Sequence, residues 1–247
     1  MRLTLHPDYK HLEAFVRSIP SHGYAEEEVC WNRRNIVERV KAPDGSEVIV
    51  KRFKPVGIFK GLIYTLLRKS KARRAYENAL YLLSQGVDTA FPIAYIEERR
   101  MGIFHAGYFI SSYLPYDTVK DMFMPEKVPA NERAEIQREL VAFLVDLHSR
   151  GIMPRDFNMD NIFYHLDTDS GKLTFSLIDI NRLGIGCHPT LSDAMKSLAQ
   201  LGVNVWVLRD FVGYYHTLTG ADPDECAYRI LSFQHKRIRR KRLLKHL

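Results

Sequence analysis

Three polar side chains around one loop constrain this chain more than any other feature. The loop Gly151–Tyr164 contains Asp156 and, five positions later, Asn161. A second aspartate, Asp179, lies in the apolar run Phe175–Ile180, which has the pattern of a strand. An aspartate inside such a strand is costly unless it has a partner or a function. An aspartate at a strand end is also a common turn former, and that alternative stays open.

The order of the surrounding elements favours a functional interpretation of these residues. A helical pattern over Glu132–Ser149 precedes the loop, and a hairpin formed by Asn161–Leu166 and Lys172–Ile180 follows it. In kinase-type phosphoryl transfer, a loop aspartate accepts the proton of the substrate hydroxyl. An asparagine five residues later and a following aspartate hold magnesium. The pattern therefore predicts a loop that binds a metal–phosphate group and accepts a proton.

The rest of the chain predicts an α+β protein with two lobes. We expect an N-terminal lobe at 1–114, which binds nucleotide, and a mainly helical C-terminal lobe at 115–247, with a ligand cleft between them. Beyond Gly186 the pattern is helical, and the last helix begins at Asp222-Pro223. In the first lobe the pattern predicts a helix at Pro7–Ile19, strands at Val29–Lys41, Ser46–Phe53, Pro92–Glu98 and Gly107–Leu114, and a helix at Ser70–Gln85 that Gly86 ends.

Lys51 and Glu77 each allow two interpretations. Lys51 ends an apolar strand, where an edge lysine often extends its ammonium group to water. It also has the place of a nucleotide-binding lysine in a Val-x-Val-Lys strand. Glu77 lies in the middle of the following helix, where it could pair with Arg73 on a wet surface or orient Lys51. We expect an ion pair between Lys51 and Glu77.

Composition indicates an ordinary globular protein of the cytoplasm. Hydrophobic residues make up 46% of the 247 residues and charged residues 26%, which excludes a disordered chain. The three cysteines, Cys30, Cys187 and Cys226, are isolated and have no metal-ligand spacing, which favours a reducing compartment. The sequence from Met1 lacks a signal-peptide pattern. No apolar run approaches the ~18 residues that would predict a membrane span.

The net charge of +7 is unevenly distributed. Residues 51–74 contain nine Lys and Arg and no acidic residue, and residues 226–247 contain eight and none. The remaining residues have a net charge of −10. Two basic segments suggest an anionic partner, either membrane headgroups, nucleic acid or a phosphorylated substrate. A solvated helix face is the alternative for a single charged run.

Together these residues resemble the protein-kinase-like fold and, more narrowly, the lipopolysaccharide kinase family, which includes Kdo and heptose kinases. Arg155-Asp156 resembles the end of the His-Arg-Asp motif, and Leu147–Ile152 its approach. Ile178–Arg182 stands in place of Asp-Phe-Gly. Further matches are Lys69–Glu77 and Gly86–Ala94. The resemblance implies Asp156 as the catalytic base, Asn161 and Asp179 as Mg²⁺ ligands, and Lys51, Glu77, Arg33, Arg34, Asn35 and Ser112 as contacts of ATP.

Departures from the family pattern are local. No GxGxxG motif is present, and the equivalent turn is Asn32–Asn35, whose side chains or amides would meet phosphate. Pro154 stands in place of the histidine of the motif, which affects the packing of the loop more than its chemistry. Asn181 replaces the glycine after Asp179, and no long activation segment follows. These features suit a small, unregulated kinase for sugar hydroxyls better than a protein kinase.

The resemblance implies an ATP-dependent kinase that phosphorylates a Kdo or heptose hydroxyl of the lipopolysaccharide inner core. The expected partners are ATP, the lipid-anchored acceptor and an anionic membrane surface. Basic segments 54–74 and 235–247 would hold the enzyme peripherally at the cytoplasmic face of the inner membrane. Aromatic interleaving of a nucleic-acid-binding motif is absent, so no nucleic acid is expected. The alternatives are a small-molecule kinase of the aminoglycoside or choline type, and a pseudokinase that binds a membrane or RNA.

Overall fold

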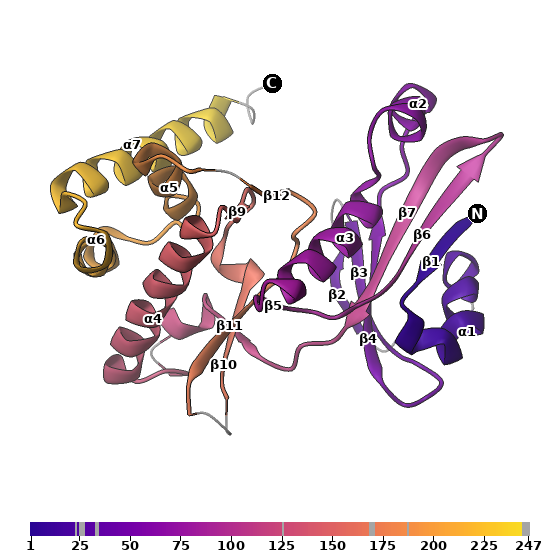
Figure 1. Cartoon of the computed structure of the whole chain (residues 1–247), viewed down its shortest axis with the longest axis horizontal. Helices are drawn as coiled ribbons and strands as arrows, with labels where there is room; N and C mark the ends of the chain where they lie inside the picture. The colour runs from indigo at the N-terminus through magenta and orange to yellow at the C-terminus, as the bar shows by residue number, and fades with distance from the viewer. Residues whose placement is uncertain are drawn as a thin grey trace. The chain divides into compact units, whose positions relative to one another are not determined.

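The chain forms two compact units in the computed structural model (Figure 1). The structure describes residues 1–22, 24, 28–32, 35–124, 126–167, 171–186 and 188–243, with the side chains of Trp206 and Lys241 excepted. Unit 1 comprises Met1–Pro115 and Asp179–Asn181, and unit 2 comprises Tyr116–Ile178 and Arg182–Leu247. The separate roles expected for the lobes 1–114 and 115–247 stay predictions.

Unit 1 is built on a six-stranded antiparallel sheet. Its strands lie in the order β1-β6-β7-β4-β3-β2. In the register of the sheet, Lys51 of β4 lies opposite Val37 of β3 and Phe109 of β7, so its strand is central. The strands are β1 (Arg2–Leu5), β2 (Glu28–Asn32), β3 (Asn35–Lys41), β4 (Glu47–Phe53), β6 (Pro92–Arg100) and β7 (Ile103–Ser112), and the short β5 (Asp88–Thr89) follows α3.

Helices cover both faces of this sheet because each strand alternates apolar side chains between them. A 3-10 helix (Pro7–Leu12) and α1 (Glu13–Ser18) pack against Val48 and Val50. On the other face, α3 (Lys71–Ser84) packs Ala72 and Tyr76 against Phe53. Since Lys51 and Phe53 are two positions apart on β4, Lys51 belongs to the face that α3 covers.

The ends of α3 agree with the sequence prediction. The hydroxyl of Ser70 accepts a hydrogen bond from the backbone N–H of Arg73 at 3.1 Å, as a residue that caps a helix does. Gly86 has a φ of +67° and ends the segment, which is the conformation that favours glycine there. Before α3 lies α2 (Ile58–Leu66), within the predicted basic and apolar segment. The helix prediction for Ser70–Gln85 is confirmed.

Unit 2 combines a small antiparallel sheet with four helices. Strand β10 (Ile162–Leu166) pairs with β11 (Leu173–Leu177) and with β8 (Asp117–Thr118). The carboxylate of Asp222 accepts a hydrogen bond from the backbone N–H of Glu225 at 2.7 Å, which confirms the predicted start of the last helix. The other described elements are α4 (Ala130–Ser149), β9 (Met153–Pro154), β12 (Leu183–Gly184), α5 (Leu191–Leu198), α6 (Val205–Thr219), α7 (Pro223–Leu243) and two 3-10 helices, Asp121–Phe123 and Met159–Asn161. None of these helices, within the part of the chain that is described, is long and apolar enough to cross a membrane.

Three sequence predictions need correction. The strand β1 was not predicted; it is four residues long and is defined by its pairing with β6. The single strand predicted at Val29–Lys41 corresponds to two strands, β2 and β3, which pair with each other in antiparallel fashion. The predicted strand Lys172–Ile180 ends at Leu177. Asp179 is therefore not a strand residue, and the apolar run continues beyond the sheet.

Candidate active site

The loop that begins at Gly151 is fixed at both ends by the backbone. Gly151 has a φ of +69° and ends α4, and the backbone N–H of Ile152 donates to the carbonyl of Leu147 at 2.8 Å. This is how a helix commonly ends in a left-handed residue. Pro154 of β9 then pairs with Leu183 of β12, and the backbone N–H of Arg155 donates to the carbonyl of Arg182 at 3.0 Å. Pro154 is buried, which agrees with a packing role at the position of the histidine in the motif.

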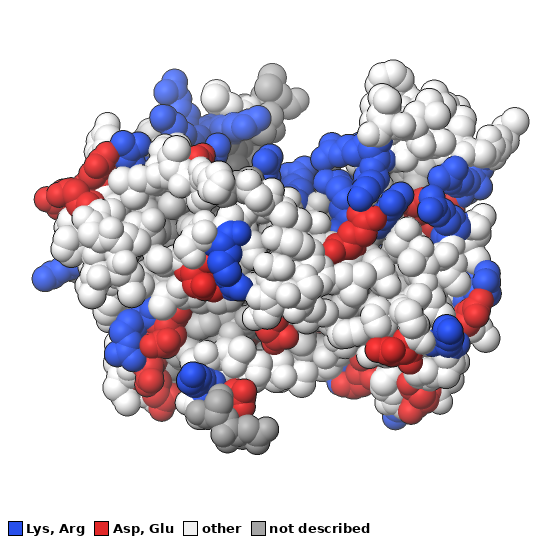
Figure 2. Space-filling model, in the orientation of Figure 1, with Lys and Arg blue, Asp and Glu red and all other residues white. Residues whose placement is uncertain are grey.

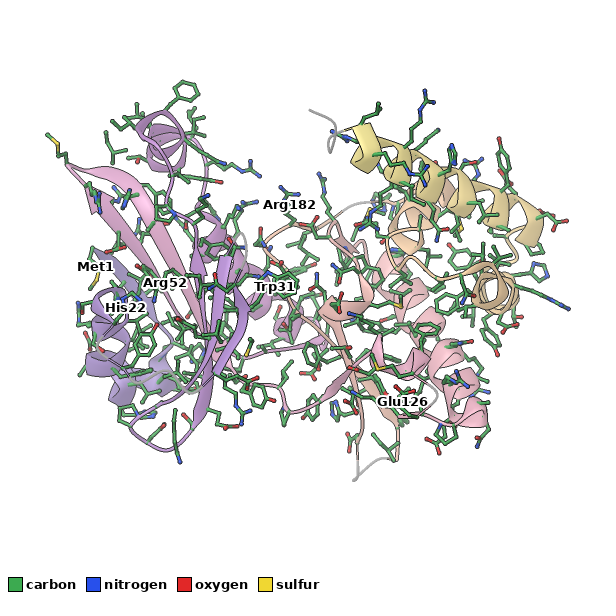
Figure 3. The ribbon with its side chains drawn as sticks, turned by 180° about the vertical axis from the view of Figure 1, so that it is seen from behind. Met1, His22, Trp31, Arg52, Glu126 and Arg182 are labelled. Atoms are coloured by element: carbon green, nitrogen blue, oxygen red, sulfur yellow. The ribbon has the colours of Figure 1, made fainter. Side chains whose placement is uncertain are left out.

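Asp156 presents its carboxylate to solvent at the start of the loop. Its side chain is 42% exposed and accepts a hydrogen bond of 3.5 Å from the guanidinium of Arg182, the residue labelled in Figure 3. The next residue, Phe157, is only 2% exposed, and its backbone N–H donates to the side-chain oxygen of Gln200 at 3.1 Å. A buried anchor directly after Asp156 fixes the backbone while the carboxylate stays accessible, as a group that contacts substrate requires.

Asn161 closes the loop back onto Asp156. Its side-chain amide donates to the backbone carbonyl of Asp156 at 3.0 Å. Its backbone N–H donates to the carbonyl of Asn158 at 3.0 Å, and its own carbonyl accepts from the backbone N–H of Ile178 at 2.9 Å. Because the amide nitrogen faces Asp156, the side-chain oxygen is the atom of Asn161 that is left to act as a ligand.

Asp179 directly follows Ile178, whose backbone N–H is bonded to Asn161, and its backbone is in the left-handed conformation. Its φ is +53°, in the left-handed region that aspartate adopts more readily than most residues other than glycine. Its carboxylate oxygen lies 2.7 Å from the ammonium nitrogen of Lys51 and accepts a hydrogen bond from the side-chain amide of Asn181 at 2.5 Å. The side chains of Lys51 and Asp179 are 15% and 29% exposed, so the pair is partly shielded from water.

The expected ion pair between Lys51 and Glu77 is not formed in the described structure. Glu77 instead pairs with Lys69 at 2.8 Å and with Arg73 at 2.9 Å. Burial raises the pKa of Glu77, but hydrogen bonds from Lys69 and Arg73 outweigh it, so the pKa lies below its ordinary value. Arg73 lies one helical turn from Glu77 on α3, so these two side chains pair locally. Lys51 forms its ion pair with Asp179 instead.

A neighbour of Glu77 makes the contact that connects α3 with the segment Asp179–Asn181. The side-chain amide of Asn78 donates to the carbonyl of Ile180 at 2.6 Å. Sequence reasoning did not predict a role for Asn78, Asn181 or Arg182. The only signal was their place beside predicted site residues, which does not show the direction of a side chain.

The other predicted contacts of ATP are placed differently. Arg33 and Arg34 lie outside the described residues. Asn35 begins β3, and its side-chain oxygen is buried with no hydrogen-bond partner among the described residues. It lines a cavity of about 120 Å³ together with Phe53, Lys54 and Lys71. The hydroxyl of Ser112 accepts a hydrogen bond from the backbone N–H of Phe91 at 2.8 Å, so it stabilises the end of β7.

The oxygen atoms of Asn161 and Asp179 fit a magnesium ion in chemical type. Magnesium is a hard cation that one or two carboxylates and substrate phosphates usually bind, with several waters retained. Among the described residues, no cluster of three or more His, Cys, Asp and Glu side chains forms a separate metal centre. Each of these two oxygen types is one that Mg²⁺ accepts, and a bound ion would draw further ligands from phosphates and water.

The fold of the chain is of the protein-kinase-like class. The sequence model of the lipopolysaccharide kinase (Kdo/WaaP) family matches residues 52–205, and the chain belongs to this family. The protein is accordingly a lipopolysaccharide kinase, an enzyme that transfers a phosphoryl group to a sugar hydroxyl. This confirms the predicted α+β kinase-like fold and the predicted family.

Solved structures of kinases are similar in fold. The structure of WaaP in complex with acyl carrier protein has a TM-score of 0.62 at 16% identity, covering 97% of this chain and 99% of that one. Rio2 kinase from Chaetomium thermophilum, in its ADP/Mg²⁺-phosphoaspartate complex, has a TM-score of 0.52 at 16% identity and covers 90% of this chain and 67% of that one. No curated protein matches the sequence.

Proposed function

We propose that this enzyme transfers the γ-phosphoryl group of ATP to a hydroxyl of Kdo or heptose in the inner core of lipopolysaccharide. The observation that carries the proposal is the backbone tether between Ile178 and Asn161, at 2.9 Å. It holds the residue before Asp179 on the loop that contains Asp156. Membership of the family indicates that the acceptor is a sugar of lipopolysaccharide. The hydrogen bond between Ile178 and Asn161 supports a common role in phosphoryl transfer for Asp156, Asn161 and Asp179.

Asp156 is the proposed catalytic base. Its carboxylate is accessible, and its backbone is anchored by Phe157 and by the amide of Asn161. A carboxylate in this position accepts the proton of the attacking hydroxyl and orients that hydroxyl toward the phosphorus. The hydrogen bond from Arg182, at 3.5 Å, is longer than usual, so the carboxylate stays sterically accessible to an acceptor hydroxyl.

Asn161 and Asp179 are the proposed ligands of Mg²⁺, and Lys51 the proposed contact of the ATP phosphates. The metal, when bound, neutralises charge that develops on the transferred phosphoryl group. Lys51 and Asp179 already lie together at 2.7 Å, which keeps the ammonium group beside the carboxylate proposed to hold the metal. Asn78 and Asn181 keep the backbone and carboxylate of the Asp179 segment in place.

Glu77, Asn35, Ser112, Arg33 and Arg34 are the further proposed contacts of ATP. Glu77, in the middle of α3, is itself paired with Lys69 and Arg73, so any role in ATP binding would be indirect. Asn35 offers a buried oxygen without a described partner. Ser112 would act through its backbone position at the end of β7. Arg33 and Arg34 remain candidates for phosphate contact on the sequence pattern alone.

Two basic segments support a location at the cytoplasmic face of the inner membrane, where a lipid-anchored acceptor would lie. These are residues 54–74 in unit 1 and 235–247 in unit 2. Exposed bases on α7 include Lys236, Arg239 and Arg240. Each base near an anionic surface contributes roughly 1 kcal/mol at most, so several together bind reversibly. Such binding raises the encounter rate with an acceptor in the same membrane.

Mass spectrometry of the core glycolipid, from cells with and without the gene, tests the proposal. A phosphate lost from Kdo or heptose without the gene supports it, and complementation with Asp156→Asn should leave the phosphate absent. An unchanged glycolipid, with phosphorylation of a soluble aminoglycoside or choline by the purified enzyme, would favour the small-molecule kinase. Nucleotide binding without any transfer to either acceptor would favour the pseudokinase.

A further inference from the structure

One face of the short helix α2 is held tightly against β7. A Cβ atom at Gly61 would lie 2.3 Å from the carbonyl oxygen of Phe104, so only glycine allows this approach. The ring of Tyr64 packs edge-on against that of Phe104, with 5.3 Å between centroids. The hydroxyl of Thr65 accepts a hydrogen bond from the backbone N–H of Phe104 at 2.9 Å. These contacts fix which face of α2 points outward.

The outward face of α2 is apolar and exposed. Ile58, Leu62 and Leu66 repeat at helical spacing, and Phe59 lies beside them. Phe59 is 80% exposed, and Met101, at the turn between β6 and β7, is fully exposed. Figure 1 shows α2 beside the tips of these two strands. An exposed apolar patch of this kind marks an interaction site rather than ordinary surface.

A basic cavity of about 250 Å³ lies at the C-terminal end of α2, next to this patch. Figure 2 shows Lys and Arg side chains gathered beneath the uncharged end of unit 1 where α2 lies. Among the described residues, Glu97 alone lines the cavity with a carboxylate; it is 5% exposed and lies 3.8 Å from Arg99. The basic residues that line it are Arg2, Arg68, Lys69, Arg73 and Arg99.

The positive charge of this cavity is not neutralised within the described residues. Lys69 and Arg73 share the carboxylate of Glu77. Arg2 and Arg68 have no ion-pair partner in the described part of the chain. The cavity is smaller than the ~300 to 1,000 Å³ of sites for drug-sized ligands, so it suits a small polar group. Guanidinium groups bind the oxygen atoms of phosphate in a fork-like geometry.

We propose that the cavity binds the phosphate of a phospholipid headgroup while the apolar face of α2 enters the lipid layer. An apolar face bordered by cations is the pattern of a helix that lies in a membrane interface. A phosphomonoester headgroup is the preferred ligand, because its additional terminal oxygen can accept more of the converging N–H groups. The inference deepens the proposed membrane location and rests on it, but it does not depend on the identity of the sugar acceptor.

Vesicle co-sedimentation of the full chain tests the cavity. Three vesicle types are compared: phosphatidylcholine alone, and phosphatidylcholine with either phosphatidylglycerol or phosphatidic acid, adjusted to equal surface potential. We expect weak binding to the first and stronger binding to phosphatidic acid than to phosphatidylglycerol. The double variant Arg2→Gln/Arg68→Gln should lower binding to phosphatidic acid by about 25-fold, since each base near the surface contributes roughly fivefold.

Matched variants separate the cavity from overall charge. Lys10→Gln/Arg209→Gln removes two exposed charges elsewhere and should retain the preference for phosphatidic acid. Phe59→Gln/Leu66→Gln should weaken binding to both anionic vesicle types, whereas Leu218→Gln/Tyr228→Gln, on α6 and α7, should not. Equal binding of the two anionic lipids at equal potential, or equal loss in the two charge variants, would overturn the cavity assignment.

Transfer to a deacylated core oligosaccharide separates this inference from the proposed enzyme function. The cavity variants should keep the wild-type rate on that acceptor, because none of their residues belongs to the proposed catalytic site. A wild-type enzyme that transfers normally but binds the two anionic vesicle types equally would overturn only the cavity assignment. Normal vesicle selectivity without any transfer would instead remove the proposed sugar kinase activity.

Discussion

The ammonium group of Lys51 lies 2.7 Å from the carboxylate of Asp179, while Glu77, its expected partner, binds Lys69 and Arg73. Lys51 therefore connects β4 with the segment after β11 rather than with α3. The exposures of 15% and 29% place this pair between a surface pair and a buried one. A residue proposed for phosphate contact and a residue proposed for metal binding thus stabilise each other.

The first prediction concerns this pair. Lys51→Met should lower the free energy of unfolding by about 1 to 2 kcal/mol, between the values for exposed and buried pairs. Urea unfolding of Lys51→Met, Asp179→Asn and the double variant gives the coupling energy. Lys69→Met, whose lysine is 53% exposed, is the control and should have a smaller effect. Additive losses in the double variant would show that the contact contributes no stability.

The second prediction tests the proposed base. Asp156→Asn should lower kcat by about two to four powers of ten, because the amide cannot accept the proton of the hydroxyl. Affinity for Mg-ATP should stay close to that of the wild type. Asp160→Asn is a matched control, since Asp160 lies on the same loop but pairs with Lys120 at 2.9 Å. A normal turnover number for Asp156→Asn would exclude Asp156 as the base.

The third prediction concerns the metal ligands. Asn161→Ala and Asp179→Ala should both weaken binding of Mg-ATP, and Asp179→Ala more, because only the carboxylate is charged. Calorimetric titration with ATP, with and without Mg²⁺, measures the effect. Each variant needs a thermal midpoint as well, since Asp179→Ala leaves Lys51 without its partner. If neither variant changes the Mg²⁺ dependence of binding, the metal site involves other residues.

Local sequence signals predicted the ends of α3 and the start of α7. The hydroxyl of Ser70 and the left-handed Gly86 define the ends of α3, and Asp222 caps α7. These interactions join residues within a few positions of each other, so the sequence alone contains them. The strand β1 was missed because it is short and its identity depends on pairing with β6, about ninety residues later along the chain.

The candidate site was only partly predictable for the same physical reason. The types and order of Asp156, Asn161 and Asp179 could be read from the sequence. The partner of Lys51 could not, because it depends on where the chain turns after β11. That turn is the left-handed conformation of Asp179, hidden in an apolar run that continues past the end of the strand. The role of Asn78 depends equally on a contact with distant backbone.

The fourth prediction tests the proposed contribution of the tail to membrane binding. Truncation after Gln234 removes the basic residues of α7 that follow it. Binding to vesicles that contain phosphatidylglycerol should fall, and the remaining binding should depend less on added salt, since fewer charges are screened. Co-sedimentation at two salt concentrations measures this. Unchanged binding would assign membrane contact to unit 1 alone, through α2 and its basic cavity.

The last prediction concerns the buried His148 near the end of α4. The residue is 7% exposed, and neither ring nitrogen has a hydrogen-bond partner among the described residues. Burial lowers the pKa of His148 to about 4. An unfolded histidine has a pKa near 6.5, so between these values the unfolded state binds more protons than the folded state. The free energy of unfolding should therefore have its full value above about pH 6.5 and should decrease by about 3 kcal/mol as the pH falls to 4.

Replacement of His148 by leucine should remove most of this dependence, because an apolar side chain of similar size needs no proton and no partner. The free energy of unfolding of His148→Leu, measured in urea from pH 7 to pH 4.5, should be nearly constant where that of the wild type falls. His235→Leu is the control, since His235 is exposed on α7 and its removal should leave the slope unchanged. A wild-type stability that does not change between pH 6.5 and 4.5 would mean that the imidazole of His148 has a partner or access to water in solution.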